Sequence, residues 1–207
     1  YAVGRQGATD GLNLPAAGLS ADSRGRIKVN DKYQTDVPHI YAAGDVIGFP
    51  ALAATGIEQA RVAVSHAFGE TMKCEIAPLL PTGIYTIPEA SMVGDTEATL
   101  VQKGVPYLVG RARYRDIPRG DIIGDQTGFL KLLFHRESLR LLGVHVLGEH
   151  ATEVVHIGLV AMLAEATAEL FNRACFNYPT LGDLYKYAAY DVLWQRRKLE
   201  KTNPAPA

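Results

Sequence analysis

One stretch of this 207-residue sequence ends in a carboxylate that is placed to do chemistry. Thr35 precedes, by five residues, the run Ile40-Tyr41-Ala42-Ala43, which Gly44 and Asp45 close. The run is typical of an apolar strand, and ligands bind at the carboxyl ends of strands in open α/β sheets. Gly44 allows close approach of the backbone, so Asp45 would accept hydrogen bonds from ligand hydroxyls, each contributing about 1.5–3 kcal/mol. The alternative is that Asp45 only orders a turn.

A helix predicted over residues 52–68 follows this carboxylate and offers a second anchoring point. Its apolar residues recur at helical spacing, and they are Ile57, Ala60, Val64, Ala67 and Phe68. The helix begins at Leu52, Ala53 and Ala54, where backbone N–H groups and the helix dipole favour a negatively charged partner. These residues would act through their backbone, so the identity of their side chains matters little. The alternative is an ordinary buried helix start.

The composition is that of an ordinary globular protein and excludes several function classes. Hydrophobic residues make up 47% and charged residues 21%, which is enough apolar material for a core. The formal net charge of −1 provides no basic surface for nucleic acid or for an anionic membrane. No run of 18 apolar residues and no signal peptide is visible. We therefore expect a cytoplasmic protein with neither a nucleic-acid nor a membrane partner.

No metal site is predicted, and no side chain is assigned as a catalytic acid, base or nucleophile. Cys74 and Cys175 are far apart and form no CxxC pair, so we expect inert, buried or half-buried thiols. His145 and His150 lack metal-ligand spacing. The segment 120–125, with its glycines and aspartates, predicts a loop rather than a calcium site.

Around these features the hydrophobic pattern predicts two regions of different character. Residues 1–23 are predicted as the exit from one domain, with a strand end at 1–4, and a half-buried strand at 25–30 follows. Residues 70–82 are a proline-containing linker, after which strands and helices alternate. Strands are predicted at 83–87, 107–114, 129–135 and 141–147, and helices at 96–103, 152–165, 168–172 and 180–196. The last two strands flank 136–140 and should form an antiparallel hairpin.

The segment from Thr35 to Asp45 resembles the second FAD fingerprint of the flavoprotein pyridine nucleotide oxidoreductases, T-x(4)-hydrophobic-Y/F-A-x-G-D. The resemblance implies that Gly44 and Asp45 bind FAD, with the Asp45 carboxylate on the ribitol chain. It also implies that the helix start at Leu52, Ala53 and Ala54 faces the pyrimidine edge of the flavin. There its N–H groups would stabilise the reduced, anionic flavin.

The segment from Thr82 to Glu97 is similar to the opening of the dimerisation domain of the same superfamily, although Asp95 departs from that pattern. The implied fold class is α+β: a remnant of an FAD/NAD(P)-binding Rossmann-like domain followed by an α+β dimerisation domain. The implied partner is a second copy, bound through residues 83–196. The implied domains are the end of an NAD(P)-binding domain (1–23), part of an FAD-binding domain (24–72), a linker (73–82), the dimerisation domain (83–196) and a polar tail (197–207).

The run Tyr178-Pro179-Thr180 distinguishes between subfamilies. It falls where the disulfide reductases carry His-Pro-Thr-x-x-Glu, whose histidine is acid and base for a thiol. A phenol with a pKa near 10 is a poor substitute, and Asp183 stands in the glutamate position. Tyr-Pro-Thr is similar to the soluble pyridine nucleotide transhydrogenases, and this implies that Tyr178 and Pro179 lie beside the partner subunit's flavin. We expect a cis Tyr178–Pro179 bond, against a base rate of about 5–6%.

The function implied by the resemblance is that of the C-terminal part of an FAD-dependent NAD(P)⁺ transhydrogenase. Hydride would pass through FAD between NADPH and NAD⁺. The chain opens at Tyr1 and contains no GxGxxG, so we expect these 207 residues alone to be inactive. One alternative is a disulfide reductase like dihydrolipoamide dehydrogenase, and the other is a non-enzymatic dimerisation fragment. Nucleotide preference and the direction of hydride transfer stay open, because no residue of this chain reads the 2′-phosphate.

Overall fold

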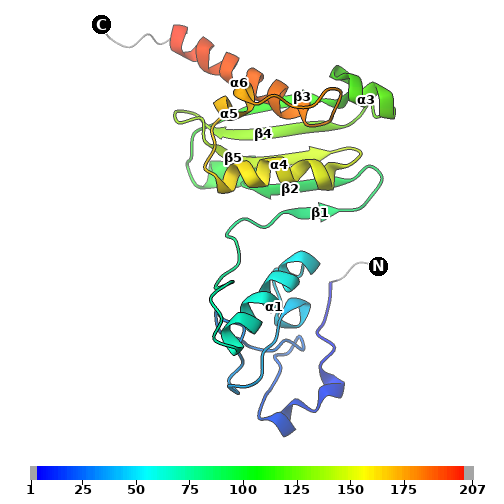
Figure 1. Ribbon diagram of the computed structural model, residues 1–207, viewed down its shortest axis with the longest axis vertical. Coiled ribbons are helices and arrows are strands. Elements are labelled where there is room, and N and C mark those ends of the chain that lie inside the picture. The colour runs from blue at the N-terminus through cyan, green and yellow to red at the C-terminus, as the bar shows by residue number, and fades with distance from the viewer. Residues whose placement is uncertain (1–3, 203–207) are drawn as a thin grey trace, which may run out of the picture. The chain divides into compact units, whose positions relative to one another are not determined.

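The computed structural model describes residues 4–202, and the chain divides into two compact units between Pro78 and Leu79 (Figure 1). Each unit is described by itself. The strand end expected at 1–4 therefore falls outside the described residues, except for Gly4. Within residues 4–202 no helix is both long and apolar enough to cross a membrane.

Within residues 4–78, the first unit consists mainly of irregular chain with short 3-10 helices and one α-helix. These elements are η1 (Asp10–Leu12), η2 (Leu14–Ala17), η3 (Gly44–Ile47) and α1 (Ala53–Ala67). The strands predicted at 25–30 and 40–43 are wrong as strands, because each pairs only through one isolated bridge, at Ile27 and at Tyr41. No described segment runs alongside either of them for longer, so no ladder of backbone hydrogen bonds forms.

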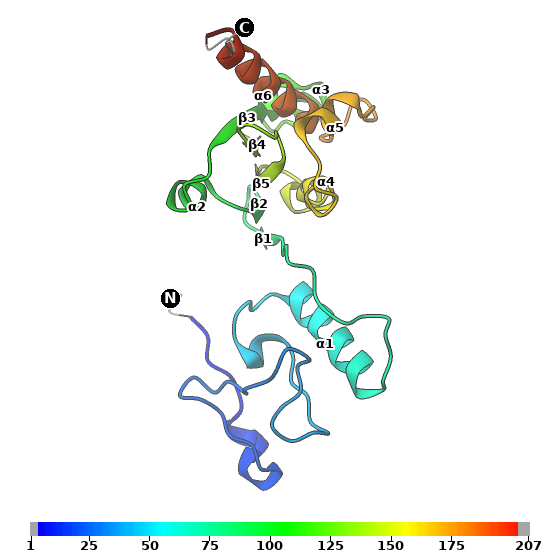
Figure 2. The ribbon, with the colours of Figure 1, turned by 90° about the vertical axis from the view of Figure 1, so that its left-hand side faces the viewer.

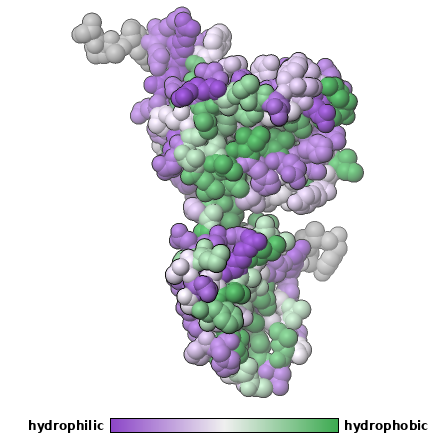
Figure 3. Space-filling view, viewed as in Figure 1, coloured by the Kyte–Doolittle hydropathy of each residue, from purple (hydrophilic) through white to green (hydrophobic). Residues whose placement is uncertain are grey.

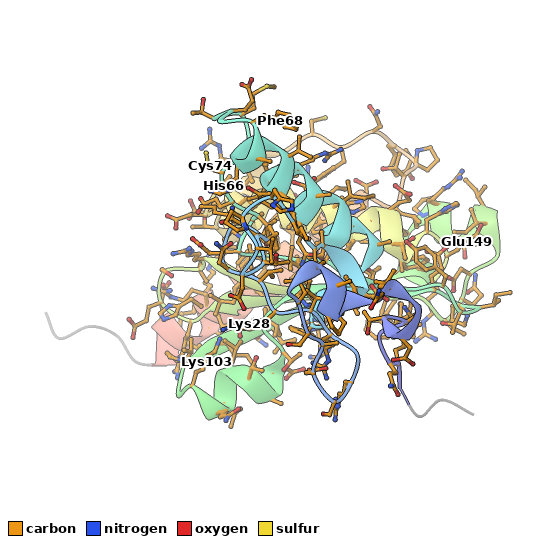
Figure 4. All side chains as sticks on the ribbon, turned by 90° about the horizontal axis from the view of Figure 1, so that it is seen from below. Lys28, His66, Phe68, Cys74, Lys103 and Glu149 are labelled. Atoms are coloured by element: carbon orange, nitrogen blue, oxygen red, sulfur yellow. The ribbon has the colours of Figure 1, made fainter. Side chains whose placement is uncertain are left out.

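Helix α1 exposes the apolar residues whose spacing predicted it. Ile57, Val64 and Phe68 are 54%, 57% and 79% exposed. The buried face is the opposite one, formed by Thr55, Gln59, Val62 and Ala63. Figure 4 shows Phe68 at the end of this helix, pointing away from it. An unpartnered apolar stripe of this kind marks an interaction surface.

The second unit, residues 79–207, is built on a five-stranded antiparallel sheet in the order β1-β2-β5-β4-β3. The strands are β1 (Thr82–Ile84), β2 (Ala90–Gly94), β3 (Tyr107–Arg113), β4 (Phe129–His135) and β5 (Leu141–Leu147). The α+β class and the β4–β5 hairpin are confirmed. Strand β2 was not predicted, because only Met92 and Val93 in its five residues favour a strand. Pairing with β1 on one side and β5 on the other holds it in the sheet.

Helices cover both faces of this sheet unequally (Figure 2). The long helices α4 (Ala151–Leu163) and α6 (Asp183–Thr202) lie on one face with the short α5 (Ala168–Arg173), and α2 (Glu97–Gln102) lies on the other. The segment predicted as a loop at 120–125 is partly helical, since α3 (Pro118–Ile123) follows η4 (Tyr114–Asp116). Pro118 starts α3, and Gly124 ends it in a left-handed conformation with φ 76°.

The core lies between the sheet and the α4–α6 layer. Its fully buried members come from β4, β5, α4, α5 and α6, and they include Leu130, Leu132, Phe134, Val144, Val155, Phe171, Leu184, Tyr185 and Val192. Helix α6 also closes the outer edge of β3. Asp191 accepts a hydrogen bond from the backbone N–H of Arg111 at 3.1 Å, and Gln195 donates to the carbonyl of Val109 at 2.8 Å. These bonds satisfy backbone groups that an open edge strand would expose.

The expected polar tail begins inside α6. The helix continues to Thr202, so residues 197–202 are helical and only 203–207 fall outside the described residues. The side chain of Lys198 lies 3.3 Å from the ring centroid of Trp194. A cation over an indole ring is favourable, and this contact stabilises the extra turn. The two cysteines are also not as expected, because both are free and exposed.

Tyr185 ties α6 to α4 through a buried hydroxyl. Its oxygen accepts a hydrogen bond from the backbone N–H of Gly158 at 3.0 Å, and it donates to the carbonyl of Val154 at 2.9 Å. Its ring stacks on Phe171 with centroids 5.2 Å apart. Burial raises the pKa of the Tyr185 phenol, so the hydroxyl stays protonated and able to donate.

We predict that Tyr185→Phe lowers the free energy of unfolding of the second unit by about 1–3 kcal/mol, because it removes the two hydrogen bonds that join α6 to α4. Tyr187→Phe is the matched control: Tyr187 is 48% exposed, and its substitution should change this free energy by less than about 0.5 kcal/mol. Urea unfolding followed by the fluorescence of Trp194, the single tryptophan, measures both. Equal stabilities for the two variants would contradict the assignment.

Candidate functional site

The loop that leads to Asp45 is held by Thr35, the first residue of the motif. The Thr35 side chain is buried. Its hydroxyl donates to the carbonyl of Ile40 at 2.9 Å and accepts from the N–H of Val37 at 3.1 Å. The Thr35 N–H also bonds to the Ile40 carbonyl, at 2.9 Å. Threonine therefore closes the four intervening residues into a turn, which explains the fixed spacing between Thr35 and Ile40.

Gly44 and α1 are locked together just before the carboxylate. The N–H of Gly44 donates to Oε1 of Gln59 at 2.7 Å, and the Gln59 side chain is buried. Gly44 has a φ of 82°, which favours glycine. A Cβ on Gly56 would lie only 3.1 Å from the Cα of Gly44, so two glycines allow the helix to approach the turn. This contact sets the direction in which Asp45 leaves the turn.

Asp45 lies in η3, two residues beyond the segment predicted as its strand, and its side chain faces a cavity of about 530 Å³. The cavity is lined by Asp45 and ten further residues: Arg5, Gln6, Gly7, Ala8, Arg24, Arg26, Val46, Gly48, Phe49 and Ala51. The carboxylate is about half exposed, and its Oδ2 lies 2.5 Å from Nη1 of Arg5, a side chain that is 80% exposed. An exposed ion pair contributes little to stability, so a ligand hydroxyl can replace Arg5 at low cost.

A backbone framework beneath the cavity holds the arginines in place. The N–H of Gly7 bonds to the carbonyl of Arg24 at 2.8 Å, which joins the segments around residues 7 and 24. Asp22 accepts hydrogen bonds from the N–H groups of Arg24 and Arg26, at 2.8 and 2.9 Å. The bond from the Arg26 backbone holds the pKa of Asp22 below its usual value. The cavity thus combines three guanidinium groups with one half-exposed carboxylate.

The start of α1 is open, as a site acting through its backbone requires. Leu52 is the N-cap in an extended conformation, and no side chain of the described residues caps the first turn. That turn contains no acidic residue, and Ala53 and Ala54 are exposed. Ala51 lines the cavity, whereas Leu52, Ala53 and Ala54 follow it on the helix without lining it. The N–H groups and the dipole of α1 are therefore free to bind an anion.

Tyr178 and Pro179 belong to the second unit, on the segment before α6. The peptide bond between them is cis, which confirms the prediction. Tyr178 is 70% exposed, and the adjoining turn is closed by a hydrogen bond of 2.6 Å from the Thr180 hydroxyl to the carbonyl of Asn177. Among the described residues no hydrogen bond joins Tyr178 to Asp183. The carboxylate therefore does not orient the phenol as a glutamate would orient a catalytic histidine.

The structure brings Asp45, Gly44 and the start of α1 together, and it adds residues that the sequence did not identify. Gln59 is one of them, and the sequence feature that could have identified it is its position on the helix face opposite the apolar stripe. Arg5 is another, but it reaches Asp45 from 40 positions away, and no sequence spacing indicates this. Within residues 4–202 no group of three His, Cys, Asp or Glu side chains is arranged to hold a metal ion.

Comparisons with known proteins agree over both units. Residues 80–189 match the model of the pyridine nucleotide-disulphide oxidoreductase dimerisation domain, and residues 1–67 match that of pyridine nucleotide-disulphide oxidoreductase. The chain is 55% identical over 201 residues to a soluble pyridine nucleotide transhydrogenase of Mycobacterium bovis, and 48% identical over 196 residues to one of Aliivibrio fischeri. These alignments cover 97% and 93% of this chain but only 43% and 42% of the relatives, so the chain spans about two-fifths of their length.

Solved structures show the same likeness. The HOCl-induced flavoprotein disulfide reductase RclA of Escherichia coli superposes with a TM-score of 0.82 at 27% sequence identity. LpdA of Mycobacterium tuberculosis superposes with a TM-score of 0.80 at 26% identity. The matches cover 89% of this chain in both cases, and 43% and 40% of those chains.

We predict that Gln59→Leu destabilises the first unit by about 1–3 kcal/mol, because the Gly44 N–H loses its buried acceptor. Asp45→Asn removes only an exposed ion pair and should change stability by no more than about 1 kcal/mol. Hydrogen exchange of the Gly44 amide measures both: exchange should accelerate strongly in the first variant and little in the second. A large effect of Asp45→Asn would mean that this carboxylate has a structural role.

Proposed function

Because this chain belongs to the pyridine nucleotide-disulphide oxidoreductases, whose dimerisation-domain model matches more than half of it, we propose that it is the C-terminal part of an FAD-dependent NAD(P)⁺ transhydrogenase. The parent would pass hydride between NADPH and NAD⁺, in either direction, by way of its flavin. That redox chemistry belongs to the cofactor, while the protein binds and orients it. The observation that carries the proposal is 55% identity, over 97% of the chain, to a soluble pyridine nucleotide transhydrogenase.

We propose that Gly44 and Asp45 hold the sugar-alcohol chain of FAD. The fit rests on the Asp45 carboxylate, which is half exposed, faces a cavity and is paired with an exposed arginine. The positive φ of Gly44 and its bond to Gln59 preset the turn before the ligand arrives. A preset acceptor loses little conformational entropy on binding, so the hydroxyl bond contributes more of its energy to affinity.

We propose that the start of α1, at Leu52, Ala53 and Ala54, stabilises the anionic edge of the reduced flavin. Its first turn lacks both a capping side chain and a carboxylate, so nothing on it competes with an anionic ligand. The exposed stripe of Ile57, Val64 and Phe68 also supports an origin in an FAD-binding domain. In the parent we expect the rest of that domain to cover the stripe. The proposed domains stay as predicted: 1–23, 24–72, 73–82 and 83–196.

Tyr178 separates this proposal from a disulfide reductase. A disulfide reductase is the second candidate function, and the structural likeness to RclA supports it. However, a phenol that no carboxylate orients is a poor acid or base for a thiol at neutral pH. We therefore propose that Tyr178 and Pro179 line the flavin site of the partner subunit without exchanging protons with a thiol. A third candidate, a dimerisation fragment without activity, describes what we expect of the 207 residues alone.

The proposed partner is a second copy of the chain, bound through residues 83–196 in a cytoplasmic homodimer. Support comes from the match to a dimerisation domain and from the surface of α4. Val160, Leu163 and, on α5, Leu170 are 65%, 47% and 48% exposed on the same side of the sheet. Figure 3 shows hydrophobic side chains at the surface of this unit. Apolar side chains gathered in this way are typical of the buried core of homodimer interfaces.

We predict that Asp45→Ala in the full-length parent weakens FAD binding roughly 10- to 100-fold, as expected for the loss of one hydrogen bond to a charged acceptor. Asp36→Ala is the control, because Asp36 is an exposed aspartate of the same loop. Flavin absorbance during titration of the apoprotein measures affinity, and hydride transfer from NADPH to thionicotinamide adenine dinucleotide measures activity. A parent that binds flavin but shows no such transfer would contradict the proposed reaction, and unchanged affinity would contradict the role of Asp45.

We further predict that Val160→Glu on α4 shifts the protein toward monomers, because a carboxylate buried in an interface has no partner. Val101→Glu on α2, on the other face of the sheet, is the matched control, since Val101 is 67% exposed against 65% for Val160. Sedimentation velocity at micromolar concentration distinguishes the two. A dimer that survives Val160→Glu and dissociates with Val101→Glu would place the interface on the α2 face.

A further inference from the structure

Three arginines alternate with buried residues along the end of β3 and the 3-10 helix η4 that follows it. Arg111, Arg113 and Arg115 are exposed, whereas Ala112 and Tyr114 between them are buried. Arg111 and Arg113 are alternate residues of β3 and lie on the same face of the sheet. Arg115 follows in η4 and lines the same cavity as the other two. Strand β3 is the outermost strand of the sheet (Figure 1), and α6 closes its backbone edge.

These arginines line a cavity of about 770 Å³ within the second unit. The remaining lining residues are Asp116 and the segment Gln126, Thr127, Gly128 and Phe129. The volume lies in the range of sites that hold whole small molecules. The cavity thus carries three cationic groups against one carboxylate, in a chain whose formal net charge is −1. Such a concentration of one sign attracts ligands of the opposite sign.

Most of the donor capacity of these guanidinium groups is unused. Arg113 donates from Nε and Nη2 to Asp116, at 2.7 and 3.2 Å, which leaves three of its five N–H bonds. Arg111 Nη2 lies 3.8 Å from Oε1 of Glu97, which is too far for a hydrogen bond. Arg115 has no ion pair with any residue in the range 4–202.

Glu97 does not neutralise the arginines, because another cation already holds it. Lys131 on β4 donates to Oε1 of Glu97 at 2.8 Å, and this bond is the main cause that holds the pKa of Glu97 below its usual value. Lys131 pairs directly with Arg111 across the two strands, so the Lys131–Glu97 ion pair lies next to Arg111 without neutralising it. The three arginines of the cavity repel one another, and a bound anion would relieve the repulsion.

The wall opposite the arginines is already ordered. Asp125 accepts hydrogen bonds from the backbone N–H groups of Gly128 at 2.8 Å, Thr127 at 3.0 Å and Glu149 at 2.9 Å. These bonds fix the segment that faces the guanidinium groups. The N–H groups of Thr127 and Gly128 are thereby occupied, and the arginines supply the cationic donors for a ligand anion.

We propose that this cavity binds the phosphate group of a small phosphorylated molecule through Arg111, Arg113 and Arg115. Planar guanidinium groups match the geometry of phosphate oxygens and bind them with paired hydrogen bonds. The site lies wholly within the second unit, so the proposal is independent of the flavin assignment. The shared chemistry is a phosphate dianion, whether free or carried by a nucleotide.

Calorimetric titration of the 207-residue chain at low ionic strength tests the site, with pyrophosphate, adenosine 2′,5′-bisphosphate and adenosine as probes. Both phosphorylated probes should bind saturably, adenosine should not, and affinity should fall as salt is raised. The double variant Arg111→Gln/Arg115→Gln should lose about tenfold or more in affinity, since two charge-assisted contacts are removed. The control Arg136→Gln/Arg173→Gln carries the same change in charge on exposed arginines of the same unit and should bind as the wild type does.

Asp116→Asn provides a test of opposite sign. It removes the carboxylate that competes for Arg113, so affinity for pyrophosphate should rise severalfold while the fold, checked by circular dichroism, stays intact. Tighter binding of the nucleotide than of pyrophosphate would identify a phosphorylated nucleotide as the ligand, and equal binding would identify the phosphate alone. Absence of saturable binding, or equal losses in the two double variants, would overturn the proposal.

Discussion

The contact between Gly44 and α1 is the constraint on which the candidate flavin site depends. A buried glutamine side chain at position 59 takes the N–H of a glycine in a left-handed turn, and a second glycine at position 56 lets the helix approach. The turn and the start of α1 are therefore held next to each other, although no regular strand leads into the turn. One interaction thereby fixes both proposed flavin contacts: the direction of the Asp45 carboxylate and the position of the open N-terminus of α1.

The sequence predicted the second unit more accurately than the first, and the reason is where each finds its hydrogen-bonding partners. Strands β4 and β5 matched their predicted bounds because they are neighbours in sequence and pair as a hairpin. Strand β2 was missed, because its pairing partners stabilise it more than its own residues do. Residues 25–30 and 40–43 have strand-like alternation, but within residues 4–202 each pairs through a single isolated bridge, so alternation alone did not produce an extended ladder.

The candidate site rests on a sequence motif, and the structure adds residues that support its geometry. Residue type and spacing predicted Asp45, Gly44 and the start of α1 as site residues, and the cis bond before Pro179 followed from the family pattern. Gln59 and Arg5 were not found, because one acts through burial and the other across 40 positions of chain. The spacing of the apolar stripe correctly predicted that α1 is a helix, yet the stripe itself is exposed. Periodicity predicts that a face will be covered, and it does not identify the segment that covers it.

The central claim is that the carboxylate of Asp45 binds the sugar-alcohol chain of a flavin. A crystal structure of the flavin-bound full-length parent tests it most directly, through the distance from the Asp45 carboxylate oxygens to the nearest ribitol hydroxyl. We predict a hydrogen bond of about 2.5–3.0 Å, with Arg5 displaced from its present pairing. A flavin bound elsewhere, with Asp45 still paired to Arg5, would contradict the account.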